Sequence, residues 1–126
     1  MLTEKDYCDY ETCVALKELG FPTKITFIGE QATIEIPINS GLIQLYEAQK
    51  FLREEKRMLV TPMLFADNLI DEDGRIVNRW LYYAYSIIST STAEYIKNYD
   101  HSDEYDSYES ALLEGIKEAV TVLKEE

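Results

Sequence analysis

The sequence predicts an α+β fold with the element order α-β-β-α-β-β-α, in which helices pack on a four-stranded, mainly antiparallel sheet. Three observations carry this prediction. Apolar residues recur at helical spacing near both ends and in the middle of the chain. Two pairs of segments with strand-like patterning lie between these helical stretches. A glycine-containing turn joins the two segments of each pair, which is typical of antiparallel hairpins.

Length, composition and charge limit the classes of protein that the chain can belong to. Its 126 residues suit a single domain (1–126), and an apolar content of 46% is ordinary for a chain that buries a core. The net charge of −12 argues against direct nucleic-acid binding, which needs a basic face, and against an anionic membrane surface. No run approaches the roughly 18 apolar residues of a membrane span, and no signal segment is evident at the start. We therefore expect a cytoplasmic protein with no membrane partner.

The first helix and the first hairpin have clear local signals. Asp9 is a good N-cap, and Gly20 followed by Pro22 predicts the end of the helix, because glycine accepts the left-handed conformation and proline prevents continuation. Residues 24–28 and 32–36 then alternate apolar and polar side chains around the turn Gly29-Glu30-Gln31. This period of two predicts a β-hairpin.

A second helix is expected from Gln44 to Lys56, where apolar residues form one stripe. Met58 to Ala66 is a short apolar strand, and its proline, Pro62, predicts an edge strand or a bulged strand. The turn centred on Asp73-Gly74 leads to Arg75–Ile88, the longest strand candidate. Because both faces of this last strand are partly apolar, we expect it to be central or covered on both sides.

The end of the chain combines a polar stretch with the best amphipathic pattern. Ser89–Asp106 is predicted to be a polar connection that is free to move. Ser107 is then a good N-cap for a last helix. Its apolar residues recur at helical spacing: Leu112, Ile116, Ala119 and Leu123.

Several of these features occur together in a recognisable order. The first helix ends at Gly20-Phe21, and the second ends in Phe-Leu-Arg-Glu at Phe51–Glu54. An apolar strand (Met58–Phe65), a Gly turn (Asp73-Gly74), a Tyr-rich strand (Trp80–Tyr85) and a capped start of the terminal helix (Tyr105–Glu109) follow. This order resembles a family of short uncharacterised proteins encoded by phages and mobile elements of gut bacteria. The resemblance implies a fold and a phage-like origin but no function, because the family has no established activity. Where such proteins usually place Gly or Asn after the second helix, this chain has Arg57, which would bear about 1 kcal/mol of strain in the left-handed conformation.

Residues that could bind a metal or a cofactor are few. Cys8, Cys13 and the single histidine, His101, fall short of the four ligands of a structural zinc site. The acidic turn at residues 71–74 lacks the ligand spacing of a calcium loop, and the scattered glycines form no nucleotide-binding loop. We therefore expect no cofactor.

The most distinctive segment mixes tyrosines with acids. From Glu94 to Glu109 there are six carboxylates and one lysine, for a local net charge of −5. Tyrosine rings supply contact area and carboxylates steer a basic partner, so this segment is either a protein interface or a solvated loop. The candidate interface residues are Tyr95, Tyr99, Asp100, Asp103, Glu104, Tyr105 and Asp106.

Two functions of different classes stay open. The favoured one is a non-enzymatic interaction or accessory protein of phage or mobile-element type that binds a protein partner, a basic one by charge, and can form a homodimer. A sharper version is an acidic mimic of nucleic acid, which occupies the basic cleft of a DNA-binding enzyme. The alternative is a small-ligand-dependent or metal-dependent enzyme that uses Asp100–Asp106 with His101, where His101 and Asp103 would be the metal ligands.

Overall fold

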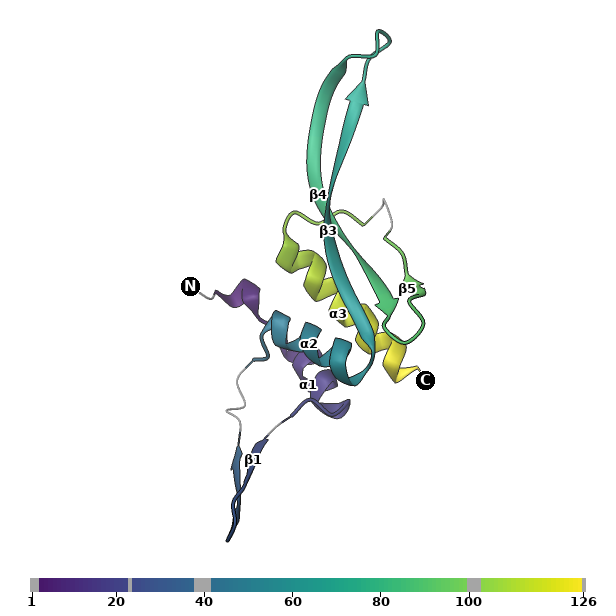
Figure 1. Cartoon of the computed structure of the whole chain (residues 1–126). Helices are drawn as coiled ribbons and strands as arrows, with labels where there is room; N and C mark the ends of the chain where they lie inside the picture. Colours follow the sequence, from purple (N-terminus) through teal and green to yellow (C-terminus); the bar gives the residue numbers. More distant parts are fainter. Residues whose placement is uncertain (1–2, 23, 38–41, 100–102, 126) are drawn as a thin grey trace.

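The computed structural model describes residues 3–22, 24–37, 42–99 and 103–125, and its architecture is α+β (Figure 1). Three α-helices and five strands follow one another along the described chain after a short 3-10 helix, η1. Their bounds are η1 Glu4–Asp6, α1 Tyr10–Glu18, β1 Lys24–Ile28, β2 Thr33–Pro37, α2 Leu45–Glu55, β3 Met58–Ile70, β4 Ile76–Ser89, β5 Tyr95–Lys97 and α3 Tyr108–Lys124. The predicted order of helices and hairpins is confirmed, with one additional strand, β5.

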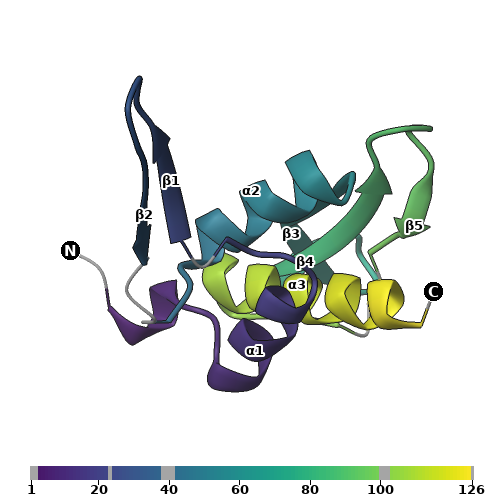
Figure 2. The same cartoon turned by 90° about the horizontal axis from the view of Figure 1, so that it is seen from below.

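The strands form two sheets, so the prediction of one four-stranded sheet is wrong. β3, β4 and β5 form a three-stranded antiparallel sheet with β4 in the centre, whereas β1 and β2 pair only with each other among the described strands. In both views the β1–β2 hairpin stands away from the helices (Figures 1 and 2). Alternation in sequence predicts strands, but it does not determine which hairpins share a sheet. Here β5, from the polar stretch, occupies the second edge of β4.

The β3–β4 hairpin is longer than predicted. β3 continues past Ala66 to Ile70, because Asp67 and Asn68 remain in the ladder opposite Trp80 and Arg79. The turn is closed by the Asp71 carboxylate, which accepts hydrogen bonds from two backbone N–H groups further along the turn at 2.9 and 3.0 Å. The ladder shifts register once, between Leu69 and Ile70.

The core lies where the helices meet the lower part of this hairpin (Figure 2). α2 and α3 both contact β3, and α3 also contacts α1, α2 and β4. The largest fully buried side chains come from all of these layers: Leu16, Leu52, Ile87, Ile116, Val60 and Cys8. Helix α3 approaches the sheet at Gly115, where an added Cβ would collide with Val60 Cγ1 and lie 3.1 Å from the Tyr85 ring.

Strand β4 is the central strand of its sheet, which confirms one of the two predicted alternatives, but its side chains are not covered along its whole length. Residues 76–81 are all exposed, whereas 84–87 are buried. Only the second half of the strand lies within reach of the helices and of β5. The first half continues out of the body together with the end of β3 (Figure 1).

The predicted helix ends are confirmed in detail. The Asp9 carboxylate accepts a hydrogen bond from the Thr12 N–H at 2.8 Å, and the Ser107 hydroxyl accepts one from the Ser110 N–H at 3.1 Å. Gly20 follows α1 with φ 107°, the left-handed region. Arg57 follows α2 with φ 56°, so it adopts the strained left-handed conformation that its position after the second helix suggested.

The stretch from Ser89 to Asp106, predicted as a polar connection, contains β5 and a second contact with the sheet. Tyr105 and Tyr83 exchange two backbone hydrogen bonds of 2.8 Å in an isolated antiparallel bridge. Residues 100–102 of this stretch lie outside the described residues.

Candidate functional site

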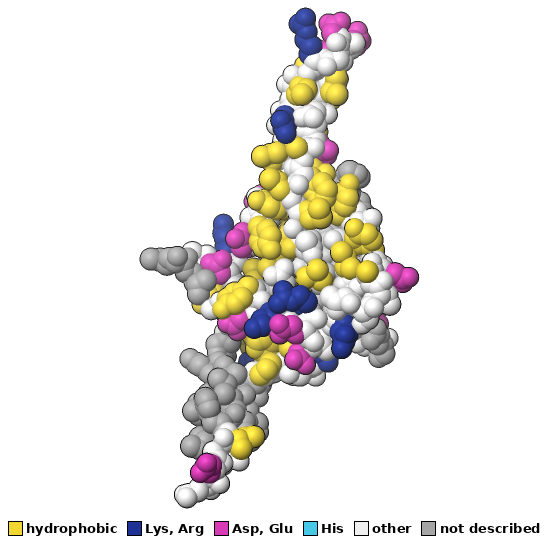
Figure 3. Space-filling view, viewed as in Figure 1, with side chains coloured by type: hydrophobic (Ala, Val, Ile, Leu, Met, Phe, Trp, Pro, Cys, Tyr) yellow, Lys and Arg dark blue, Asp and Glu magenta, His cyan; other side chains and the backbone are white. Residues whose placement is uncertain are grey.

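The main surface feature is the outer part of the β3–β4 hairpin with its turn, residues 63–81, which we call the arm. It extends away from the three helices (Figure 1), and hydrophobic side chains run along it while charged ones gather at its tip (Figure 3). Half of the exposed large hydrophobic residues in the described part of the chain belong to the arm. They are Met63, Leu64, Leu69, Ile70, Ile76, Val77, Trp80 and Leu81.

Both faces of the arm are apolar. Residues directly opposite each other in a sheet lie on the same face, so Leu64 shares its face with Tyr83. Tyr83 contacts the ring of Tyr108 in α3, with ring centroids 6.1 Å apart, and this face is therefore the α3 face. Leu81 also lies on the α3 face, whereas Trp80 is on the far face. Folding the arm back onto its own body would cover only one of the two faces.

The exposed apolar area of the arm is divided between its two faces. Its eight large hydrophobic residues are 39–62% exposed. Taking roughly 160 Å² for a fully exposed large apolar residue, they leave on the order of 700 Å² in contact with water over both faces together. One face therefore offers about half of the roughly 800 Å² that a standard interface buries on each partner, an area at the weak and transient end of the range.

Charge is distributed unevenly within the arm. The arm has four acids and two arginines, a net charge of −2 over its 19 residues, which is nearly the same proportion as the −10 of the remaining 107. Three of the four acids lie in the turn, so the strand portions, with Arg75 beside the turn, carry one acid, Asp67, against Arg75 and Arg79, a net charge of +1. The strand portions of the arm therefore repel a second acidic chain less than the turn does.

Aromatic stacking fixes the root of the arm on its far face. The Phe65 ring stacks on Tyr82 at 5.6 Å and on Tyr99 at 4.2 Å between centroids. Trp80 Nε1 donates a long hydrogen bond of 3.5 Å to Glu104. Two predicted interface residues of the segment after β5 thus contact the arm. Tyr99 stacks on Phe65, and Glu104 accepts the hydrogen bond from Trp80.

The predicted interface residues separate into two groups. Tyr105 is half-buried and bridges to Tyr83, and Asp103 pairs with Lys97 at 3.4 Å. Tyr95, on β5, and Glu104 and Asp106, in the loop, are exposed. Asp100 lies outside the described residues.

The metal alternative places His101 together with Asp103. Of the two, only Asp103 lies within the described part of the chain, and its carboxylate pairs with the Lys97 ammonium. Among the described residues, no group of three His, Cys, Asp or Glu side chains is close enough together to hold a metal ion.

Lys97 is the centre of the densest polar cluster in the described residues. Its Nζ contacts Glu118 at 2.9 Å and donates to the Tyr85 hydroxyl at 3.2 Å, while that hydroxyl donates to Glu118 at 2.5 Å. Burial and the bond to Glu118 raise the pKa of Tyr85. Partial burial alone would lower the pKa of Lys97, but the bonds to Glu118 and Tyr85 outweigh it and raise that pKa. Both groups are held protonated, so the cluster fastens β5 to α3 and does not create a nucleophile or a base.

The two cysteines are buried and free. Burial, with the neighbouring Cys13 thiol, raises the pKa of Cys8 to about 12. The Cys13 sulfur accepts a hydrogen bond from the Ile43 N–H at 3.3 Å. Cys8 is therefore a thiol, not a reactive thiolate, at neutral pH.

Comparison with protein-family models, with curated proteins and with solved structures found no match. In the described residues no helix is long and apolar enough to cross a membrane. Inferences about function therefore depend on the geometry of the chain itself.

Sequence reasoning missed the arm. Its signal was present, because Arg75–Ile88 is apolar on both faces. We interpreted that pattern as burial within a sheet, whereas the apolar residues at 76–81 are exposed to solvent. A pattern of apolar residues on both faces predicts that something covers both faces, and it does not say whether that cover belongs to the same chain.

Proposed function

We propose that this chain is a non-enzymatic protein-interaction module whose working surface is the arm, and that the arm docks against the arm of a second copy. The observation that carries this proposal is the exposure of large hydrophobic side chains on both faces of the arm, which projects from the body. Contiguous exposed apolar patches of several hundred Å² often mark sites of interaction.

A second copy suits the arm for two reasons. It supplies an identical arm with the same exposed apolar residues. In a two-fold symmetric dimer with antiparallel arms, the same residues are buried on both chains. The strand portions of the arms, with a net charge of +1 each when Arg75 beside the turn is included, are also where two chains of net charge −12 can approach with little repulsion, because three of the arm's four acids lie in its turn. The edges of β3 and β4 in the arm add unpaired backbone groups that can extend the contact.

Arginine substitution in the arm tests this proposal. Leu69→Arg/Leu81→Arg places one charge on each face, at residues that are 55% and 62% exposed. The matched control is Leu42→Arg/Tyr46→Arg, which changes two residues of the body that are 49% and 61% exposed. Sedimentation velocity over a series of chain concentrations then measures the monomer–dimer equilibrium of all three proteins.

We expect wild type and the body variant to dimerise with the same dissociation constant, and the arm variant to stay monomeric over the same range. Surface substitutions change the free energy of unfolding by only about 0.5 kcal/mol, so the melting temperatures should stay close to wild type. Wild type that is monomeric throughout, or an arm variant that dimerises like wild type, would contradict the proposal. The two single variants show which face of the arm is used.

The acidic segment is a second proposed surface, for a basic protein partner. It is favoured by the exposure of Tyr95, Glu104 and Asp106 in the described part of the segment. A mimic of nucleic acid would displace DNA from a DNA-binding enzyme in a salt-sensitive way. Competition assays at low and moderate salt with Glu104→Gln/Asp106→Asn as the control test this version, and no salt-sensitive competition by wild type would remove it.

The enzyme alternative keeps one direct test of its own. Thermal melts of wild type and His101→Ala with and without divalent cations show whether a metal stabilises the chain. A metal-dependent rise in melting temperature that is lost on substitution would favour the alternative over the interaction module.

A further inference from the structure

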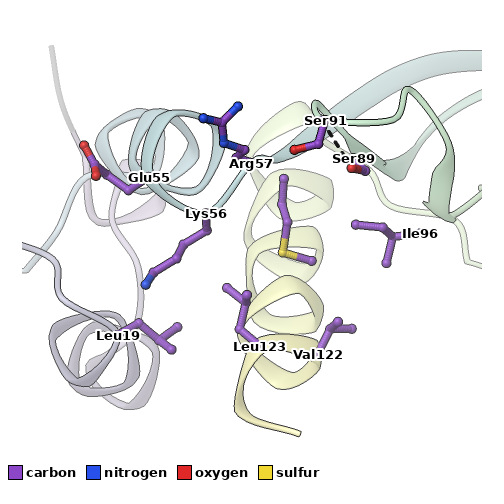
Figure 4. A pocket seen from close by; sticks show the side chains of 10 residues that line it. Leu19, Glu55, Lys56, Arg57, Ser89, Ser91, Ile96, Val122 and Leu123 are labelled. Carbon is purple, nitrogen blue, oxygen red and sulfur yellow. Dashed lines mark hydrogen bonds between the residues drawn. The ribbon is translucent and has the colours of Figure 1, made fainter. Parts of the chain in front are cut away.

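A cleft of about 650 Å³ opens on the body, between the end of α2, the start of β3, the end of β4 and the last turns of α3. Figure 4 shows its lining. Leu19 and Lys56 lie on one side, Ile96 on the other, Val122 and Leu123 below, and Arg57, Ser89 and Ser91 above. The volume suits a small molecule, since most ligand pockets measure about 300–1,000 Å³.

Much of the lining of the cleft is apolar. Met58, which is buried, lines it, and the other apolar lining residues come from the end of α1, from β5 and from α3: Leu19, Ile96, Val122 and Leu123. Ile96 is 40% exposed, although it faces a space bounded by other apolar side chains. A ligand with an apolar part would remove these side chains from water.

Two cations line the cleft on different sides. Neither Lys56 nor Arg57 has an ion-pair partner among the described residues. In Figure 4 the Lys56 side chain points toward Leu19, whereas the Arg57 side chain lies at the top with Ser89 and Ser91. Glu55 also lines the cleft, but in Figure 4 its carboxylate points away from the other labelled side chains.

Two hydroxyl groups complete the polar edge. The Ser89 hydroxyl accepts hydrogen bonds from the backbone N–H groups of Ser91 at 3.3 Å and Thr92 at 3.4 Å. Because these bonds use its lone pairs, its own hydrogen is available to donate. The Ser91 side chain lies beside it at the mouth of the cleft (Figure 4).

The backbone at Arg57 is strained where it meets the cleft. Its φ of 56° lies in the left-handed region, which glycine adopts freely and a residue with a long side chain does not. Its carbonyl accepts a hydrogen bond from the Thr90 N–H at 3.0 Å, so the conformation is held by the neighbouring strand end. Strained residues of this kind gather at ligand sites, where the side chain serves a purpose that glycine could not.

From this geometry we infer that the cleft binds a small amphiphilic anion, in which an apolar chain or ring ends in a carboxylate or a phosphate. The apolar part lies on Met58, Ile96 and Leu123, and the anionic head lies beside Arg57 and the serine hydroxyls. Carboxylate and phosphate share the chemistry that this edge offers, which is a forked guanidinium and neutral hydroxyl donors. This site is separate from the arm and does not depend on self-association.

Methyl NMR with short-chain probes tests the inference. Octanoate and octyl phosphate present the two anionic heads, and octanol presents the same chain without a charge. Titration of each into the full chain should be followed at the methyl groups of Met58, Ile96, Val122 and Leu123. We expect saturable shifts at these methyl groups with one or both anions, and binding of octanol that is about tenfold weaker.

Arg57→Gly separates binding from folding. Glycine relieves the strain at φ 56°, so the variant should melt a few degrees higher than wild type while it loses the guanidinium. We expect its affinity for the anionic probes to fall about fivefold or more, with octanol binding unchanged. Arg53→Gln is the matched control, because Arg53 is an exposed α2 cation that pairs with Glu54 and does not line the cleft.

Three results would overturn the inference. They are the absence of saturable shifts at the cleft methyl groups with either anion, equal affinity for octanol and the anions, and unchanged anion affinity in Arg57→Gly. Stronger binding of octanoate would identify a carboxylate as the preferred head, and stronger binding of octyl phosphate would identify a phosphate; either result supports an anion site.

Discussion

Gly115→Ala should destabilise the protein, although the same change stabilises most exposed helix positions. Gly115 lies in the middle of α3, where alanine is favoured over glycine by about 1 kcal/mol in helix propensity. The opposing effect is steric. The new methyl group would collide with Val60 Cγ1 and lie 3.1 Å from two carbons of the Tyr85 ring. Neither neighbour has room to move, since Val60 is fully buried and Tyr85 is 6% exposed.

The magnitude follows from the balance of these two effects. Overpacking a close contact costs about 1–3 kcal/mol, and more where the neighbours are fixed. After subtraction of the propensity gain, we expect a loss of about 1–2 kcal/mol in the free energy of unfolding. For a domain of this size that lowers the melting temperature by roughly 3–8 °C.

Thermal and urea unfolding of Gly115→Ala measure this loss. Thr121→Ala is the matched control, because it changes an exposed position of the same helix and should be neutral or slightly stabilising. A Gly115→Ala variant that is as stable as wild type, or more stable, would refute the close packing of α3 on β3 and β4.

Three further predictions concern groups outside the arm and the cleft. Asp9→Ala should lower the free energy of unfolding by about 1 kcal/mol at neutral pH, because the N-cap of α1 is lost. The hydrogen bond from Thr12 and the neighbouring Lys117 lower the pKa of the Asp9 carboxyl. The stability that Asp9 contributes is therefore present above its ordinary pKa of 3.8 and is lost as the pH falls through the lowered value. In urea titrations from pH 7 to pH 2, the difference in free energy of unfolding between Asp9→Ala and wild type should shrink only at the acid end. Cys8, with its pKa raised to about 12, should not react with a disulfide reagent in the folded chain at pH 8, but it should react after unfolding in guanidinium. Fast labelling of Cys8 in the native chain would contradict this prediction, because it would show that the thiol is accessible. Tyr85→Phe should cost about 1–2 kcal/mol, because the hydrogen bond to Glu118 is lost while the ion pair of Glu118 with Lys97 remains; urea unfolding equal to wild type would show that this bond does not contribute.

Features encoded within a few residues could be predicted from the sequence. The N-caps Asp9 and Ser107 each act on a backbone N–H three residues away, and Gly20 ends α1 by its own conformational freedom. The turn at Asp73-Gly74 was also predicted from its residue types, and Gly74 adopts the left-handed conformation, with φ 81°. Each of these depends on local backbone geometry, which the sequence determines directly.

Features that depend on distant partners could not be predicted. The polar pair Asp67-Asn68 indicated the end of a strand, yet β3 continues, because the ladder with β4 does not need buried side chains. β5 lies in a segment without alternation and pairs only because β4 presents a free edge. The tyrosines of the acidic segment indicated an interface, but Tyr99 and Tyr105 pack on the sheet of their own chain, which no local pattern shows.

The same limit applies to the candidate sites. The cleft combines the ends of α2, β4 and α3, which are far apart in the sequence, so only the strain at Arg57 could be anticipated. The arm was visible as a pattern of apolar residues, but its exposure depends on where the helices and β5 stop covering the sheet.

Direct contact between the arms of two chains is the most immediate test of the proposed function. An isotope-filtered NOE spectrum of a 1:1 mixture of labelled and unlabelled chains detects only contacts between copies. We predict intermolecular NOEs among the methyl groups of one face of the arm, either Leu64 and Leu81 on the α3 face or Met63 and Leu69 on the far face. Intermolecular NOEs confined to the helices, or a mixture with none at concentrations where the chain sediments as a dimer, would contradict the proposal that the arms form the interface.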